Sequence, residues 1–160
     1  MKDAPKTIIF AVAAVFLCVI AAVTSPKKNI DALFVDLGTD FYPDFTDPLK
    51  AASLEVIGTD KETGILLPFK VALKDGRWTI PSHNNYPADA KDKVAKLAAN
   101  FVGIKRDELR SELPSDHEVL EVVDPAAQTP TGKGIRVTLK DENGNTLCDY
   151  ILGKEVDGKY

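Results

Sequence analysis

Residues 65–82 read Ile65-Leu-Leu-Pro-Phe-Lys-Val-Ala-Leu-Lys-Asp-Gly-Arg-Trp-Thr-Ile-Pro-Ser82, and the predicted sheet is built around them. Two segments in which apolar and polar residues alternate flank Asp75-Gly76, the strongest short-range signal for a β-hairpin. A two-residue turn sets one register, in which the opposed residues are Lys74 and Arg77, Leu73 and Trp78, and Val71 and Ile80. Because a lone hairpin is only marginally stable, other strands or a helix must cover its apolar face.

The residues just before the hairpin predict a third strand. Ser53-Leu-Glu-Val-Ile57 is mostly apolar, and the polar residues 58–64 connect it to the hairpin. Together the three strands form an antiparallel meander. Pro68 lies inside the second strand and has no N–H to donate, so we expect a bulge or a sheet edge at this position.

Helical spacing follows the hairpin. Pro87 can open a helix as its first residue, and Gly103 ends it. The apolar face of this helix consists of Ala90, Val94, Leu97, Ala98 and Phe101. A second short helix is predicted over residues 106–113, before Pro114. Ser115-Asp-His-Glu118 matches a capping box and predicts a third helix of one or two turns.

A second hairpin follows near the C-terminus. Residues 135–140 alternate between apolar and polar, and Asn143-Gly144 signals a two-residue turn. In that register the opposed residues are Leu139 and Cys148, Val137 and Tyr150, and Ile135 and Leu152. Cys148 is then a small core residue rather than a reactive thiol. The order of elements predicts an α+β domain over residues 53–160, with two to three helices on one face of the sheet.

The N-terminal residues predict a membrane anchor. Residues 8–23 are sixteen consecutive apolar residues, and as a helix they span about 24 Å, just enough to cross the core of a bilayer. A helix that is apolar all round has little to bury it at a chain end, which disfavours a buried soluble helix. A cleaved signal peptide is the closer alternative, but it needs a shorter run and a clean cleavage site. We expect residues 1–28 to form a cytoplasmic tail and an uncleaved transmembrane helix, with the remaining chain exported.

Residues 29–52 combine aromatic and acidic side chains. Pro43 and Pro48 break any long element in this segment. Its aromatic residues are Phe34, Phe41, Tyr42 and Phe45, and its acidic residues are Asp36, Asp40, Asp44 and Asp47. A ligand-binding patch is one interpretation. The favoured interpretation is an irregular lead-in whose aromatic side chains pack against the edge of the domain.

The composition disfavours several classes of function. The chain has 160 residues and a net charge of −4, and its charges of both signs are interspersed, so it lacks the basic face of most nucleic-acid-binding proteins. Its two cysteines, Cys18 and Cys148, predict neither a disulfide nor a zinc site. His117 lies in the predicted helix cap, where a histidine faces solvent.

Motifs that carry chemistry are absent from the sequence or incomplete. Gly132-Lys133-Gly134 lacks the spacing of a phosphate-binding loop, and residues 141–145 lack the glycine position of a calcium loop. We therefore expect no catalytic residue, cofactor or metal. A hydrolase with paired carboxylates stays a less favoured alternative, because such pairs need to be close only in space.

One loop offers a candidate ligand site. It holds His83, Asn84, Asn85 and Tyr86 between the hairpin and the first helix. With the aromatic residues near Phe41, these amides and rings suit a sugar or another small ligand. The simpler interpretation is a hydrogen-bonded connector.

Several short motifs in fixed order resemble an uncharacterised bacterial family, domain of unknown function 4340. They are Ser53-Leu-Glu-Val-Ile57, Asp75-Gly-Arg-Trp-Thr-Ile80, Asn85-Tyr-Pro-Ala-Asp-Ala90, Ser115-Asp-His-Glu118, Val123-Asp-Pro125, Gly134-Ile-Arg-Val-Thr-Leu-Lys140 and Ile151-Leu-Gly-Lys154. The resemblance covers most of residues 45–160. It implies an N-terminal membrane helix, an exported α+β region, and gene neighbourhoods that encode gliding-motility-type ABC transporters. It supplies no catalytic residues.

The same resemblance implies a truncated member, because relatives continue with further strands. The final hairpin is then expected to leave an exposed edge. The function expected from these observations is that of a single-pass protein of the bacterial inner membrane. Its extracytoplasmic domain would be a non-catalytic accessory or protein-interaction module, with ABC transporter components as candidate partners. The alternative is an exported module that binds a glycan or small ligand.

Overall fold

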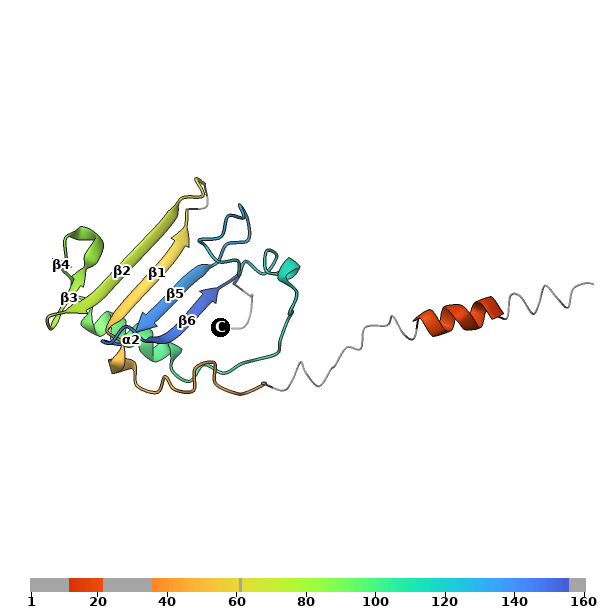
Figure 1. The fold of residues 1–160 in the computed structure, drawn as a ribbon. Coiled ribbons are helices and arrows are strands. Elements are labelled where there is room, and N and C mark those ends of the chain that lie inside the picture. Colours follow the sequence, from red (N-terminus) through yellow and green to blue (C-terminus); the bar gives the residue numbers. More distant parts are fainter. Residues whose placement is uncertain (1–11, 22–35, 61, 156–160) are drawn as a thin grey trace, which may run out of the picture. The chain divides into compact units, whose positions relative to one another are not determined.

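The computed structural model describes residues 12–21, 36–60 and 62–155, and it divides the chain into two units, residues 1–35 and 36–160. In the first unit, residues 12–21 are helical (Figure 1). No helix among the described residues is both long enough and apolar enough to cross a membrane. The rest of the predicted anchor, residues 8–11 and 22–23, lies outside the described residues, as does Phe34.

The second unit is an α+β fold built on a six-stranded antiparallel sheet of order β4-β3-β2-β1-β5-β6 (Figure 1). Its strands are β1 (Ser53–Thr59), β2 (Leu66–Lys74), β3 (Arg77–Ile80), β4 (Tyr86–Pro87), β5 (Ile135–Lys140) and β6 (Thr146–Leu152). The helix α2 (Lys91–Phe101) packs on one face, and the short 3-10 helices are η2 (Pro48–Lys50), η3 (Pro81–His83) and η4 (Pro114–Asp116).

The first hairpin has the predicted turn and register. Lys74 pairs with Arg77 and Leu73 with Trp78, and the ladder ends one pair later at Ala72 and Thr79, before the predicted pair of Val71 and Ile80. Asp75 has φ 51° and Gly76 has φ 75°, the left-handed pair that a type I′ turn requires. The meander of β1, β2 and β3 is confirmed.

Pro68 lies at an edge, one of the two predicted outcomes. On one side β2 pairs with β1 along its whole length, with Pro68 opposite Ile57 and no shift in register. On the other side β3 pairs only with residues 72–74. Among the described strands, none pairs with residues 66–71 on that side, so the missing N–H of Pro68 is tolerated there.

The second hairpin keeps the predicted register through its core. Leu139 pairs with Cys148 and Ile135 with Leu152, but the register shifts between Leu139 and Lys140, so Lys140 pairs with Thr146. The prediction of a two-residue turn at Asn143-Gly144 is therefore wrong, and residues 141–145 form the loop. The Asp141 carboxylate stabilises this longer loop by accepting hydrogen bonds from the backbone and side chain of Asn145 and from the Asn143 N–H, which lowers its pKa.

The helix α2 begins later than predicted. Pro87 does not open it but pairs with Thr79 in β4, and the next N–H, of Ala88, donates to the Trp78 carbonyl. The chain therefore stays extended until Ala90, the N-cap residue. The predicted apolar face is correct, since Ala90, Val94, Ala98 and Phe101 are buried and Leu97 is partly buried against them.

The two further helices predicted after α2 are wrong. Residues 106–113 have no helical structure, because Arg106 exchanges backbone hydrogen bonds with Gly38 and Thr39 of the lead-in segment. The third predicted helix is reduced to η4 and a series of turns. The capping box is not formed, since the hydroxyl of Ser115 bonds to the carboxylate of Asp116.

The lead-in segment packs against the domain, as favoured from its sequence. Phe45 is 2% exposed and belongs to the main core. The Tyr42 hydroxyl donates to the Asp149 carbonyl of β6, 2.6 Å away. The ring of Tyr150 stacks on Phe101, and the rings of Phe41 and Tyr42 contact it edge-on. Burial raises the pKa of the Tyr150 hydroxyl to about 12.

Candidate interaction surface on the sheet

One face of the sheet is apolar and is organised in three rows of cross-strand neighbours. The first row is Val71, Leu54, Leu139 and Cys148, and the second is Phe69, Val56, Val137 and Tyr150. The third consists of Leu67 opposite Gly58 and of Ile135 opposite Leu152. Because side chains alternate along a strand, all three rows point to the side that carries α2.

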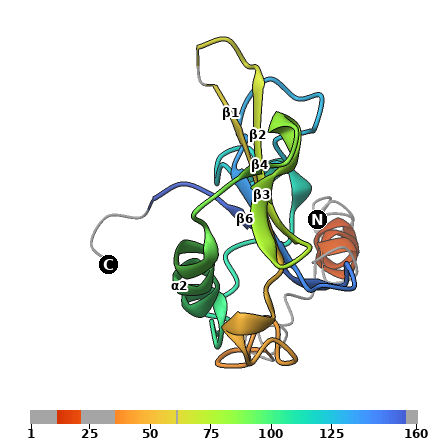
Figure 2. The ribbon, with the colours of Figure 1, turned by 90° about the vertical axis from the view of Figure 1, so that its left-hand side faces the viewer.

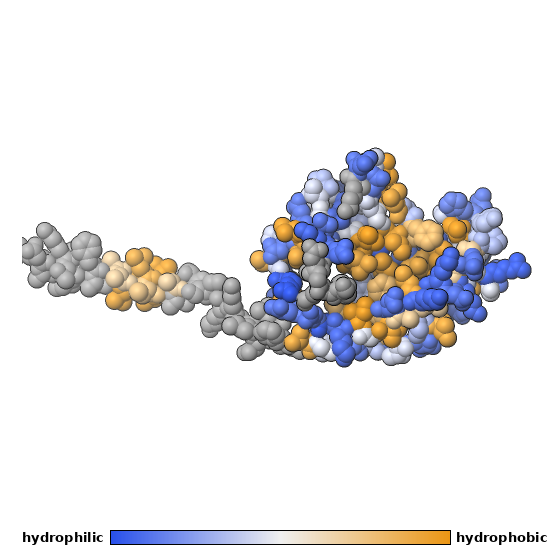
Figure 3. Space-filling model, turned by 180° about the vertical axis from the view of Figure 1, so that it is seen from behind, coloured by the Kyte–Doolittle hydropathy of each residue, from blue (hydrophilic) through white to orange (hydrophobic). Residues whose placement is uncertain are grey.

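The helix α2 covers only one end of this face. The first row is buried against it, with Val71 3% exposed. At the other end are four large apolar side chains that together we call the open half-face: Leu67 (56% exposed), Phe69 (49%), Ile135 (48%) and Leu152 (45%). Figure 2 shows α2 against the lower part of the sheet, and Figure 3 shows extensive apolar surface on this side.

Two hollows border the open half-face. One, of about 400 Å³, lies between α2 and the sheet and is almost wholly apolar. It is lined by Leu54, Phe69, Val71, Ile80, Ala88, Asp89, Ala90, Lys93, Val94 and Leu97. The other, of about 460 Å³, lies at the far ends of the strands, where Gly58, Leu67 and Ile135 meet Asp60, Glu121 and Lys133. The apolar surface is therefore hollowed at both ends.

Charged side chains stand at the rim of each hollow. Neither Lys93 nor Lys133 forms an ion pair with any residue that the structure describes. The Asp60 carboxylate is already engaged, because it accepts hydrogen bonds from the backbone and hydroxyl of Thr63 and from the Glu62 N–H. These bonds lower the pKa of Asp60. The two lysines are thus available to an incoming acidic group.

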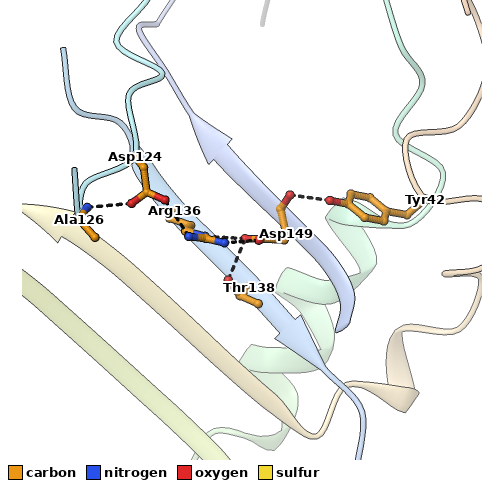
Figure 4. Close-up of polar contacts among 6 residues, drawn as sticks. All are labelled: Tyr42, Asp124, Ala126, Arg136, Thr138 and Asp149. Carbon is orange, nitrogen blue, oxygen red and sulfur yellow. Dashed lines mark hydrogen bonds and ion pairs between the residues drawn. The ribbon is translucent and has the colours of Figure 1, made fainter. Parts of the chain in front are cut away.

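The opposite face of the sheet carries a polar cluster. Arg136 donates to both oxygens of Asp149, at 2.9 and 2.6 Å, and to Asp124 at 2.7 Å (Figure 4). Thr138 also donates to Asp149, and the Ala126 N–H donates to Asp124. The hydrogen bond and charge of Arg136 lower the pKa of Asp149, and the carboxylates raise that of Arg136. These groups satisfy one another, so the cluster fixes the β5–β6 hairpin.

The predicted ligand loop is exposed, and its parts are not brought together. His83 ends η3 and lies 2.9 Å from the Ser82 hydroxyl, while Tyr86 in β4 is 67% exposed. Asn84 and Asn85 have φ 52° and 56°, as in a tight connector. Phe41 instead packs on Tyr150 of β6, and β4 and β6 are the two outer strands. The structure therefore does not bring Tyr86 and Phe41 onto one surface, and ligand binding by the loop stays a prediction.

The glycines around Lys133 have a structural role. A Cβ at Gly132 would lie 2.5 Å from the backbone of Glu118, and one at Gly134 would lie 2.6 Å from the Leu152 carbonyl. The chain segments approach so closely here that only glycine fits. Among the described residues, no group of three or more histidines, cysteines or carboxylates is placed to hold a metal ion.

The open half-face was not identified from the sequence, although a signal for it exists. Both hairpins are apolar along one whole face, including Leu67 and Ile135 at the ends far from the turns. Within residues 36–60 and 62–155, α2 is the one α-helix available to cover them. Comparing the length of the apolar strands with that of the covering helix would have predicted a surplus of apolar surface.

A family model described as "Domain of unknown function (DUF4340)" matches residues 78–160. The match begins in β3 and includes α2, β5 and β6. No curated protein and no solved structure matches the chain.

Proposed function

The chain belongs to the family described as domain of unknown function (DUF4340), and on that premise we propose a membrane-anchored envelope protein whose α+β domain binds another protein. The observation that carries the proposal is the open half-face. Monomeric soluble proteins seldom leave contiguous large apolar side chains on an ordered sheet, and such patches commonly mark interaction sites. Leu67, Phe69, Ile135 and Leu152 form such a patch.

The membrane anchor rests on sequence. The sixteen apolar residues 8–23 support a single transmembrane helix, with the domain on the extracytoplasmic side of a bacterial inner membrane. Alkaline carbonate extraction tests the anchor, and protease treatment of spheroplasts tests the side. Retention in the membrane pellet and digestion from outside are expected. Mature protein free in the cytosol would contradict both.

The binding role is that of a non-catalytic accessory, and components of an ABC transporter are the candidate partners implied by the resemblance. Chemical cross-linking and co-purification from native membranes, in a mild detergent, test this role. We expect a stoichiometric partner. Recovery of an unattached monomer under the same conditions would argue strongly against it.

Glycan binding through His83, Asn84, Asn85 and Tyr86 has less support. The exposed ring of Tyr86 suits a sugar, but the second aromatic platform expected near Phe41 is engaged in packing against Tyr150 and Arg106. A paired-carboxylate hydrolase also has less support, since Asp124 and Asp149 are tied to Arg136.

A further inference from the structure

The open half-face has room for one helix. Beyond the covered Val71, β2 continues for five residue steps to Leu66, or about 17 Å. A helix with its side chains is about 10–12 Å across, so one helix fits beside α2 on this uncovered end of the apolar face, which we call the strip. The strip crosses four strands, in the order β2, β1, β5 and β6. The axes of β2 and β6 are about 14 Å apart, and a helix of about three turns spans this distance. The sheet of a second copy would have to pack across the whole apolar face, but α2 already covers one end of that face.

A notch in the strip marks where a side chain can insert. Gly58 lies opposite Leu67 in β1, and the hollow at the strand ends brings both together with Ile135. A Cβ built at Gly58 has nothing within 4 Å. Glycine inside a strand commonly marks the close approach of another element. Here it leaves a depression between two exposed aliphatic side chains.

The helix α2 places one lysine, Lys93, at the edge of the strip. Lys93 and Leu97 line the hollow beside Phe69, and Lys96 is exposed one turn from Lys93. Asp89 also borders this hollow, and Asp92 is exposed one turn from Lys96, so the charges along this side of α2 balance. Lys93 itself forms no ion pair with any residue that the structure describes, so a segment lying along α2 is complemented by a carboxylate placed opposite Lys93.

From these observations we propose that the open half-face binds an amphipathic α-helix of about three turns from a partner protein, beside α2. The apolar side of that helix covers Leu67, Phe69, Ile135 and Leu152, one of its side chains enters the notch over Gly58, and one of its carboxylates faces Lys93. The inference rests on the proposed function, because it names the element by which the bound protein is held.

Site-specific photo-cross-linking in native membranes tests the inference on the full chain. A benzophenone amino acid replaces Phe69 or Ile135 on the open half-face, and Lys70 serves as the control on the other face of the same strand. Adducts are mapped by mass spectrometry. We expect adducts from positions 69 and 135 but not from 70. Within the partner they should fall three or four residues apart in one segment that carries a carboxylate on one flank.

Three substitutions then separate this site from other contacts. Gly58→Val fills the notch with a strand-forming residue, and Lys93→Glu reverses the charge at position 93. Each should lower the adduct yield at position 69 by roughly fivefold or more. Lys91→Glu is the matched control, since Lys91 lines a different hollow on the other side of α2. Thermal unfolding of each variant shows whether the fold is kept.

The remaining outcomes of these experiments show whether the inference, the proposed function or both are wrong. Adducts within a second copy of this chain, or adducts spaced two residues apart as in a strand added to the free edge of β2, would overturn the inference. So would an unchanged yield in folded Gly58→Val and Lys93→Glu chains. A partner that co-purifies but forms no adduct at 69 or 135 defeats the inference and leaves the proposed function standing. Absence of any partner by cross-linking or co-purification defeats both.

Discussion

The surroundings of Cys148 suppress the reactivity that an exposed cysteine has. Its side chain is 0% exposed, and burial raises the pKa of the thiol to about 11. At pH 8 only about one thiol in a thousand is then ionised, whereas a free cysteine reacts readily. Cys148 behaves as a small apolar residue in the first row of the sheet.

We predict that Cys148 resists alkylation until the domain unfolds. In a Cys18→Ser background, iodoacetamide at pH 8 should label less than about a tenth of the folded protein while it labels unfolded chains fully. The measurement is intact mass with and without urea. Replacement by serine should lower the free energy of unfolding by about 1–3 kcal/mol, because it buries a hydroxyl. Rapid labelling of the folded chain would contradict this placement.

The ion pairs of Arg136 with Asp124 and Asp149 make the free energy of unfolding depend on pH in the acid range. The pKa of Asp149 is lower folded than unfolded, chiefly through its hydrogen bond with Arg136. The stabilisation is therefore fully present above the unfolded pKa, near 4, and is lost as pH falls through the folded value. We predict that Asp149→Asn costs about 1–2 kcal/mol at pH 7 and that the difference from wild type shrinks below about pH 4.

Urea unfolding at several pH values measures this difference. Glu142→Gln is the control, because Glu142 is an exposed carboxylate in the loop after β5. It should change stability by less than about 0.5 kcal/mol at any of these pH values. A constant deficit of Asp149→Asn down to pH 2 would mean that the ion pair is not its cause.

At the scale of elements, the first turn is the most strictly determined feature. Gly76 has φ 75°, a conformation that side chains disfavour, whereas Gly58 has open space and no positive φ. We predict that Gly76→Ala lowers the free energy of unfolding by about 1–2 kcal/mol. Gly58→Ala should be neutral or stabilising by up to about 1 kcal/mol. Equal effects in chemical denaturation would refute the assigned turn.

The hairpins were predictable because their signals are local. The Asp75-Gly76 turn and the alternation on each side specify one register. Alternation also predicted the pairing of Leu139 with Cys148, although the two-residue turn predicted at Asn143-Gly144 was wrong. The helix predicted at 106–113 failed because a distant segment competes for its backbone, through Gly38 and Thr39. Nothing in the local sequence reports that pairing, and the late start of α2 at Lys91 likewise depends on the bond between Ala88 and Trp78.

At the scale of the whole domain, the two halves of the apolar face should respond differently to the same substitution. Val71 and Phe69 lie on the same strand and face, but only Val71 is covered by α2. We predict that Val71→Thr costs about 1–3 kcal/mol of unfolding free energy, because it buries a hydroxyl. Phe69→Thr should change it by less than about 1 kcal/mol. Similar losses in thermal and urea unfolding would show that the domain covers its own face.

The surface for a partner was harder to predict than the fold, because it depends on what is left uncovered. The residues proposed from sequence, His83 to Tyr86, were chosen for their chemistry and occupy an exposed connector. Ile135 and Leu152 were predicted as an opposed pair of the second hairpin, but the exposure of Leu67, Phe69, Ile135 and Leu152 was not predicted. Only the placement of one short helix across one end of the sheet turns them into a surface.

The position of the single tryptophan has a practical consequence for spectroscopy. Trp78 lines a hollow with Lys91 and Ala95, whereas the open half-face is bordered by Lys93 and Leu97 on the other flank of α2. Its intrinsic emission therefore reports the closure of the first hairpin and global melting. A tryptophan-free binder seated on Phe69 would leave the spectrum unchanged, and a flat titration curve would be mistaken for inactivity. In a Cys18→Ser background, an environment-sensitive dye attached to a Leu67→Cys variant, with the native thiol at 148 shielded, would report such a complex directly.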